Sequence, residues 1–91
     1  MEQLTQQEID CLRRVAFTNK QVARQLDISL QTVKNHLRSA YRKLDVSVPP
    51  TGIHDLEGQR RLRALIRALK LGYLSLDEII LPAKRHYLEE I

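Results

Sequence analysis

The hydrophobic positions in the first part of the chain recur at helical spacing. Ile9, Leu12 and the apolar residues that follow them share one face of a helix. Just before this stripe, Thr5 and Glu8 have the spacing of a capping box, in which each side chain bonds the other residue's backbone N–H. The pattern predicts a first helix over about residues 6 to 16.

The same start signals recur twice more along the chain. Thr18 and Gln21 repeat the capping-box spacing and predict a short second helix from about residue 19 to 26. A turn follows, and its last residue, Ser29, is a typical N-cap for a third helix over residues 30 to 44. A short helix, a tight turn and a longer helix together form the geometry of a helix-turn-helix.

The predicted third helix has two chemically distinct sides. Its apolar side carries Leu30, Val33, Leu37, Ala40, Tyr41 and Leu44. Its polar side carries Gln31, Thr32, Asn35, Arg38, Ser39 and Arg42, with Lys34, His36 and Lys43 on the flanks. Residues 28 to 44 contain no acidic residue, so every side chain on this side is either basic or neutral.

A connector and a fourth helix come next. Pro49, Pro50 and Gly52 break the helical pattern within residues 45 to 55, and a new helix is predicted over about residues 56 to 71. The apolar stripe of this helix consists of Leu62, Leu65, Ile66 and Leu69, which we interpret either as core or as the seam of a homodimer. Its far side carries Arg60, Arg63, Arg67 and Lys70, a stripe typical of a solvated face that could also follow DNA phosphates.

The last segment is expected to be a short helical extension. Gly72 is a plausible stop for the fourth helix, and Ser75 with Glu78 gives a third capping-box spacing. We therefore divide the chain into a helical domain over residues 1 to 74 and an extension over residues 75 to 91, and the fold class is all-α.

Length, charge and cysteine content narrow the function. A chain of 91 residues is one domain, too small for separate substrate and cofactor halves, and the pattern indicates no catalytic constellation, so an enzyme is not expected. Three dispersed histidines and one cysteine, Cys11, offer no metal-ligand spacing, and we expect neither a metal nor another cofactor. With no second cysteine and no membrane-length apolar run, a cytoplasmic protein that does not enter membranes is the default.

The distribution of charge points to a polyanionic partner. The net charge of +4 lies in the first three quarters of the chain, because residues 75 to 91 carry more acids than bases. Basic side chains read guanine edges and carboxamides read adenine edges in the major groove, and an acid on the same face would repel the phosphates. A solvated surface helix is the alternative, but such helices usually mix both signs. The acid-free third helix therefore favours double-stranded DNA as the partner.

The residues also resemble a known family. The strings Leu4-Thr5 with Glu8, Asn19-Lys20-Gln21-Val22-Ala23, Thr32-Val33-Lys34-Asn35-His36-Leu37 and Tyr41-Arg42-Lys43-Leu44 are similar to the LuxR/GerE-type DNA-binding domain of bacterial transcription regulators. The resemblance covers about residues 4 to 46 and implies a four-helix helix-turn-helix domain whose third helix reads DNA and whose fourth often mediates dimerisation. The turn over residues 16 to 19 is shorter than is usual in that family.

The resemblance and the helical faces together give the candidate site. The residues expected at base edges are Lys34, Asn35 and Arg38. The residues expected at the DNA backbone are Thr18, Asn19, Lys20, Ser29, Gln31, Thr32, Tyr41, Arg42 and Lys43. The function so predicted is a sequence-specific transcriptional regulator. A module similar to region 4 of sigma factors, or a helix-turn-helix adaptor that binds RNA polymerase or another regulator, remains the alternative.

Overall fold

The computed structural model describes residues 2–46 and 57–82, with the side chains of residues 57–59 left aside. The helices in this part of the chain are α1 (Gln6–Leu12), α2 (Asn19–Leu26), α3 (Leu30–Lys43) and α4 (Glu57–Lys70), followed by the 3₁₀ helix η1 (Leu76–Glu78). The described residues contain no strand, and the predicted all-α class with four helices is confirmed. No helix among them has the length and apolar character needed to cross a membrane.

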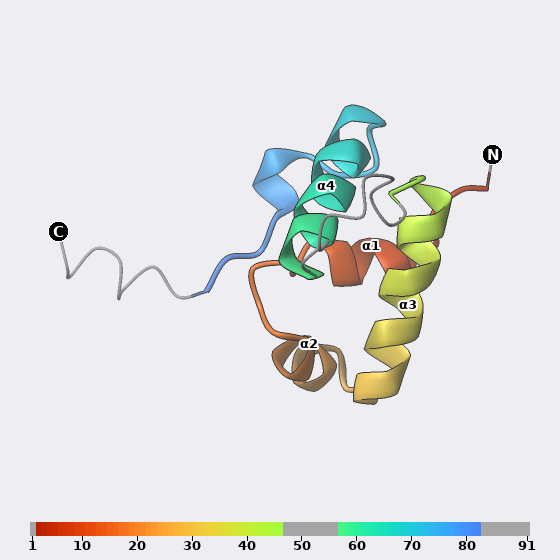
Figure 1. Ribbon diagram of the computed structural model, residues 1–91. Helices are drawn as coiled ribbons and strands as arrows, with labels where there is room; N and C mark the ends of the chain where they lie inside the picture. The colour runs from red at the N-terminus through yellow and green to blue at the C-terminus, as the bar shows by residue number, and fades with distance from the viewer. Residues whose placement is uncertain (1, 47–56, 83–91) are drawn as a thin grey trace, which may run out of the picture.

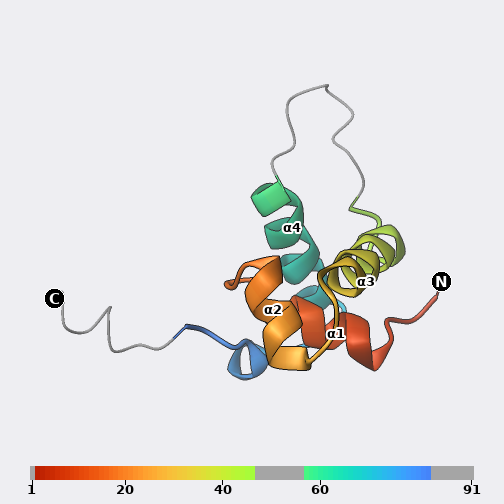
Figure 2. The same cartoon turned by 90° about the horizontal axis from the view of Figure 1, so that it is seen from below.

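Helix α3 is the element against which the others pack. It runs along the side of α1 and α2, and α4 lies against both α1 and α3 (Figures 1 and 2). The largest fully buried side chains at the centre include Leu12, Val22, Val33 and Leu37 of the first three helices. Helix α4 closes this core with Ala64, Leu65 and Ala68, so the position of α3 depends on all three of its neighbours.

The helix starts follow the capping signals of the sequence. The Thr5 side chain accepts from the N–H of Glu8 while the Glu8 carboxylate accepts from the N–H of Thr5, and Thr18 and Gln21 form the same reciprocal pair. Ser29 Oγ accepts from the N–H of Thr32 at 3.0 Å and caps α3. These bonds satisfy N–H groups that would otherwise lack partners in the first turn, and the predicted starts of the first three helices are confirmed.

Helices α2, α3 and α4 all end in the same hydrogen-bonded motif. A residue at positive φ follows each helix: Asp27 at 56°, Asp45 at 58° and Gly72 at 86°. The next residue is apolar and its N–H reaches back five residues, as in the bond from Val46 to the carbonyl of Tyr41 at 3.0 Å. This is the Schellman motif, and its apolar residue packs under the helix end. The chain direction after each helix is therefore fixed locally, and Gly72 is confirmed as the stop of α4.

Helix α1 is shorter than predicted. It ends at Leu12, and the N–H groups of Arg14 and Val15 bond carbonyls only three residues back. The apolar stripe continues into residues 13–16, which is why the pattern predicted helix up to residue 16. The tighter turn there is held by a long-range bond from the Arg61 guanidinium of α4 to the carbonyl of Phe17, at 2.8 Å.

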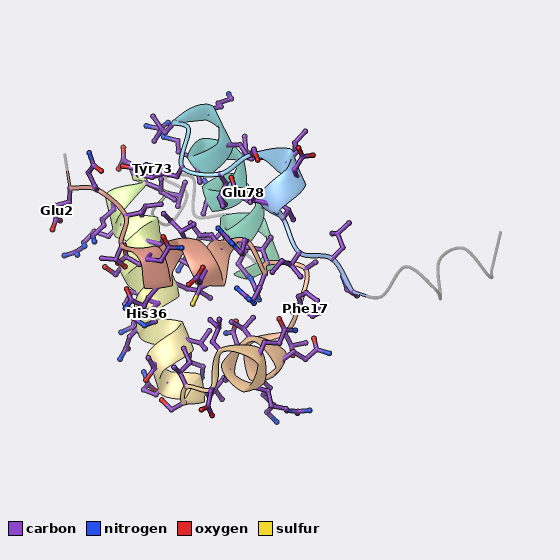
Figure 3. All side chains as sticks on the ribbon, turned by 180° about the vertical axis from the view of Figure 1, so that it is seen from behind. Glu2, Phe17, His36, Tyr73 and Glu78 are labelled. Atoms are coloured by element: carbon purple, nitrogen blue, oxygen red, sulfur yellow. The ribbon has the colours of Figure 1, made fainter. Side chains whose placement is uncertain are left out.

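The segment after α4 returns to α1. Leu74 is buried, and the N–H of Ile80 donates to the carbonyl of Arg13 at 2.8 Å. The side chain of Glu78 is labelled in Figure 3. Its carboxylate accepts from the N–H of Ser75 and lies 3.5 Å from the Arg13 guanidinium. The predicted helical restart at Ser75 is thus a single 3₁₀ turn, while the predicted turns beyond Pro82 and most of the connector over 45–55 lie outside the described residues.

Candidate nucleic-acid interface

The three residues predicted to face bases lie together on the outer side of α3. Lys34, Asn35 and Arg38 are all exposed, within little more than one turn of one another. Gln31 Nε2 donates to Asn35 Oδ1 at 3.1 Å, which holds the Asn35 carboxamide along the helix axis. The structure therefore brings together on one helix face two cationic groups and one carboxamide.

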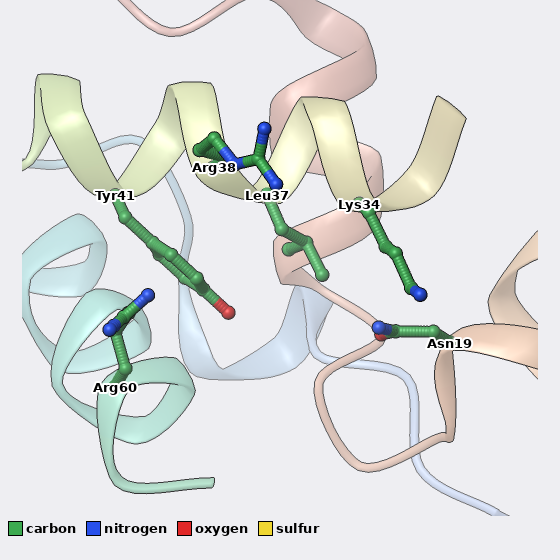
Figure 4. Close-up of a pocket in the computed structure, with 6 residues that line it drawn as sticks. All are labelled: Asn19, Lys34, Leu37, Arg38, Tyr41 and Arg60. Atoms are coloured by element: carbon green, nitrogen blue, oxygen red, sulfur yellow. The ribbon is translucent and has the colours of Figure 1, made fainter. Parts of the chain in front are cut away.

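Arg38 stands between two hollows in the surface. The first, which we name the three-helix hollow, has a volume of about 280 Å³ (Figure 4). It is lined by Asn19 of α2, by Lys34, Leu37, Arg38 and Tyr41 of α3, and by Arg60 of α4. The second, of about 240 Å³, is lined by Asn35, Arg38, Ser39 and Arg42. None of these described lining residues is acidic, so both hollows are electrostatically suited to anions.

The residues predicted to contact the DNA backbone divide into outward and inward groups. Those at the starts of α2 and α3, and Arg42 further along α3, are exposed or half-buried; they are Thr18, Asn19, Lys20, Ser29, Gln31, Thr32 and Arg42. The N-terminal ends of α2 and α3 present N–H dipoles suited to phosphate. Lys20 lies away from Asn19, in a separate hollow on the outside of α2 that also contains Arg24 and Asp27.

Tyr41 and Lys43 have internal roles instead. Tyr41 is 5% exposed because it sits on the apolar side of α3, and the Arg60 guanidinium lies over its ring at 5.7 Å from the centroid. Lys43 Nζ lies 3.0 Å from Glu8 Oε1 and 3.2 Å from the carbonyl of Gln3. The two charged side chains of this pair are only 10% and 4% exposed. Contact of Tyr41 or Lys43 with phosphate remains a prediction, and the structure gives both a place in the packing.

The environment of Glu8 keeps its carboxylate charged. Burial acts to raise the pKa of Glu8, but the hydrogen bonds from the Thr5 backbone, Ser39 and Lys43, and the charge of Lys43, together lower it below its ordinary value. A charged Glu8 at neutral pH ties α1 to the C-terminal turn of α3. It thereby helps to hold α3 in the orientation that exposes Lys34, Asn35 and Arg38.

The sequence of this chain matches a family of known proteins. The model of the family described as bacterial regulatory proteins, luxR family, matches residues 2–48. This chain belongs to the luxR family. The matched span contains α1, α2 and α3, whereas α4 and η1 lie after it.

Similar curated proteins carry regulator names. A nitrate/nitrite response regulator protein homolog of Haemophilus influenzae is 48% identical over 48 residues, which cover 50% of this chain and 23% of that protein. The nitrate/nitrite response regulator protein NarP of Escherichia coli is 51% identical over 45 residues, 47% of this chain and 21% of NarP. A monoamine regulon transcriptional regulator of Klebsiella aerogenes is 51% identical over 41 residues, 45% of this chain and 18% of that protein.

These matches concern a part of each protein. This luxR-family chain spans about a fifth of the length of the curated relatives it matches. No solved structure matches it significantly.

In this luxR-family chain, the apolar stripe of α4 lies partly in the core and partly at the surface. Leu65 is 9% exposed and belongs to the core, and Leu69 is half-buried against it. Leu62 and Ile66 are 56% and 44% exposed. Of the four residues predicted to form a dimer seam, Leu62 and Ile66 are therefore the two whose side chains are exposed at the surface.

Sequence reasoning missed three contacts around the luxR-family helices. These are the buried pair of Glu8 and Lys43, the bond from Arg61 to Phe17, and the position of Arg60 beside Tyr41. The adjacent arginines at the start of α4 were a signal that more than a solvated stripe was present. Among the described residues no cluster of histidine, cysteine or acidic side chains is arranged to hold a metal ion, and Cys11 is fully buried.

Proposed function

We propose that this chain is a sequence-specific DNA-binding transcriptional regulator that reads the major groove with α3. The observation that carries the proposal is the exposed, acid-free face of α3, with Lys34, Asn35 and Arg38 side by side. Lysine and arginine suit the O6 and N7 acceptors of guanine, and asparagine suits N6 and N7 of adenine. The membership of the luxR family and the regulator names of the relatives support the same function.

Phosphate contacts position such a helix in the groove, while base contacts supply the specificity. The exposed starts of α2 and α3, with Thr18, Lys20 and Ser29, support this positioning role because N–H groups and hydroxyls suit phosphate oxygens. We propose that the protein acts in the cytoplasm, where bacterial DNA lies.

We further propose that two copies associate through the outer face of α4. Leu62 and Ile66 are exposed aliphatic side chains one turn apart, and apolar groups of this kind gain from burial against a second copy. The same exposure favours a second candidate function, an adaptor that binds RNA polymerase or another regulator. The two functions differ in salt dependence, since DNA binding weakens steeply with salt and an apolar contact does not.

The decisive experiment is a selected-site binding assay on the Arg38→Ala variant. Loss of one base-reading arginine should weaken binding to the preferred duplex by about 1 to 3 kcal/mol and remove discrimination at one base position. Arg24→Ala is the matched control, because Arg24 is exposed on the outer side of α2. It should leave the preferred sequence unchanged. An Arg38→Ala protein with wild-type affinity and sequence preference would show that α3 does not read bases through this residue.

A further inference from the structure

We propose that the three-helix hollow holds one phosphate of the DNA backbone and that Arg60 of α4 is a DNA-contacting residue. The inference rests on the proposed function and extends it to a helix that lies after the family match. The ligand is a phosphodiester group on the strand beside α3.

The charge of the hollow defines its ligand. Lys34, Arg38 and Arg60 place three cationic side chains around one depression of about 280 Å³, and no described lining residue is acidic. The floor is apolar, since Leu37 is only 2% exposed. Cations that surround a partly desolvated depression favour an anion more strongly than the same cations dispersed in water.

Asn19 gives the hollow an unsatisfied polar group. Its Oδ1 is buried and has no hydrogen-bond partner in the described part of the chain. The Lys34 side chain extends from α3 toward the Asn19 side chain (Figure 4). An ammonium has three donors, so Lys34 can donate to Asn19 Oδ1 and to a phosphate oxygen at the same time. A bound phosphate therefore draws Lys34 into a position where the buried acceptor is satisfied as well.

Arg60 is held in place for this role. Its guanidinium lies over the ring of Tyr41, 5.7 Å from the centroid, and Tyr41 is fixed in the core at 5% exposure. A guanidinium that lies over an aromatic ring is held near a fixed position, and its planar set of N–H groups has the geometry that recognises phosphate oxygens. The other basic side chains of α4 lie elsewhere: Arg63, Arg67 and Lys70 line a separate groove with Asp45 and Ile66.

The position of the hollow fits the path of a DNA strand. Lys34 and Arg38 belong both to the hollow and to the face expected at base edges. A helix in the major groove is flanked by the two phosphate backbones, so a depression beside that face meets phosphates. Asn19 at the start of α2 and Arg60 near the start of α4 then contact one backbone from two sides.

The test compares the variants Arg60→Gln and Arg67→Gln of the whole 91-residue chain. Arg67 is the matched control because it lies on the same helix, outside the hollow. Binding to the selected duplex and to random duplex DNA is measured over a range of salt. A lost phosphate contact reduces the salt slope by about 0.9, so the deficit of Arg60→Gln should shrink about 3.5-fold between about 50 and about 200 mM salt. The deficit should be equal for both duplexes, and Arg67→Gln should behave as the wild type.

A second set of measurements identifies the phosphate. Single phosphates of the selected duplex are replaced one at a time by neutral methylphosphonates. One position should weaken the wild type and Arg67→Gln, and should have no further effect on Arg60→Gln. Arg60→Lys should retain the wild-type salt slope because it keeps the charge, and circular dichroism melting confirms that each variant is folded.

The outcomes separate the two proposals. If the wild type binds the selected duplex with sequence preference and Arg60→Gln matches Arg67→Gln, the phosphate site is overturned while the proposed function stands. If folded Arg60→Gln alters the preferred sequence with an unchanged salt slope, Arg60 does not act on a phosphate. If the wild type binds no duplex, both proposals fail.

Discussion

The buried pair of Glu8 and Lys43 allows a quantitative test of what holds α3 in place. The substitution Glu8→Gln removes the charge and keeps the shape of the side chain. Glutamine still accepts from the N–H of Thr5, as Gln21 does in the equivalent box at the start of α2. The variant therefore isolates the charge interaction with Lys43 from the capping of α1.

The burial of the pair sets the size of the effect. Lys43 and Glu8 side chains are 10% and 4% exposed, so water screens their attraction poorly. Loss of the carboxylate leaves the Lys43 ammonium with the Gln3 carbonyl at 3.2 Å and a neutral amide. A hydrogen bond to a charged group contributes about 1.5 to 3 kcal/mol, and we expect Glu8→Gln to lower the free energy of unfolding by about 2 kcal/mol. Glu8→Ala also removes the cap and should lower it by about 3 kcal/mol.

The pH dependence of the stability difference provides a second, independent test of the charge interaction. The pKa of folded Glu8 lies below its ordinary value of 4.5, so the pair stabilises the fold above that value and loses its effect as pH falls through the lowered pKa. Urea unfolding at neutral pH should separate the wild type from Glu8→Gln, and the difference should shrink as the pH falls below the ordinary value and through the lowered pKa.

Glu78→Gln is the control, because Glu78 also bonds the N–H of its capping residue but is exposed. The pKa of Glu78 is also lowered, chiefly by the backbone hydrogen bond from Ser75, but solvent screens this exposed carboxylate, so Glu78→Gln should differ from the wild type much less than Glu8→Gln does at neutral pH. A Glu8→Gln protein as stable as the wild type at neutral pH, or a deficit that persists unchanged at low pH, would refute the role of the charge.

Two further predictions concern the helix ends and the buried thiol. Asp27 and Asp45 occupy the left-handed conformation that glycine adopts without strain, so Asp27→Gly and Asp45→Gly should each raise the free energy of unfolding by about 0.5 kcal/mol. Gly72→Ala should lower it by about 1 kcal/mol, because alanine is strained at positive φ. Urea unfolding measures all three changes. A rank order with Gly72→Ala as the most stable protein would contradict the positive φ at that position. Burial, with a smaller effect from Asp10, raises the pKa of Cys11 to about 11. A thiol reagent at neutral pH should therefore label Cys11 only as fast as the protein unfolds. Prompt labelling of the folded protein would instead place Cys11 at the surface.

The sequence predicted those features that depend on neighbours along the chain. The starts of α1, α2 and α3 follow from Thr5, Thr18 and Ser29, because each cap bonds an N–H three residues away. The exposure of Lys34, Asn35 and Arg38 follows from the helical repeat once α3 is known to bury its apolar side.

Features that depend on distant residues were not predictable in this way. The apolar repeat continues past the end of α1 at Leu12, and the turn that follows is bonded at Phe17 by Arg61, which lies on another helix. Lys43 reads as a surface cation unless Glu8, 35 residues earlier, is known to face it. The rotation of α4 about its axis, which buries Leu65 and exposes Leu62, is set by packing against α1 and α3.

Three consecutive residues near the start of α4 point in different directions and have different surroundings. Arg60 lies beside Tyr41, Arg61 bonds the carbonyl of Phe17, and Leu62 is exposed on the opposite side. Successive residues of an α-helix are separated by about 100° around its axis. An insertion or deletion of one residue before these positions would therefore rotate all three side chains about the helix axis at once. The helical register of α4 therefore constrains three features together: the three-helix hollow beside α3, the α1–α2 turn and any partner of the outer face. Among related proteins these features can diverge by substitution far more readily than by changes in length.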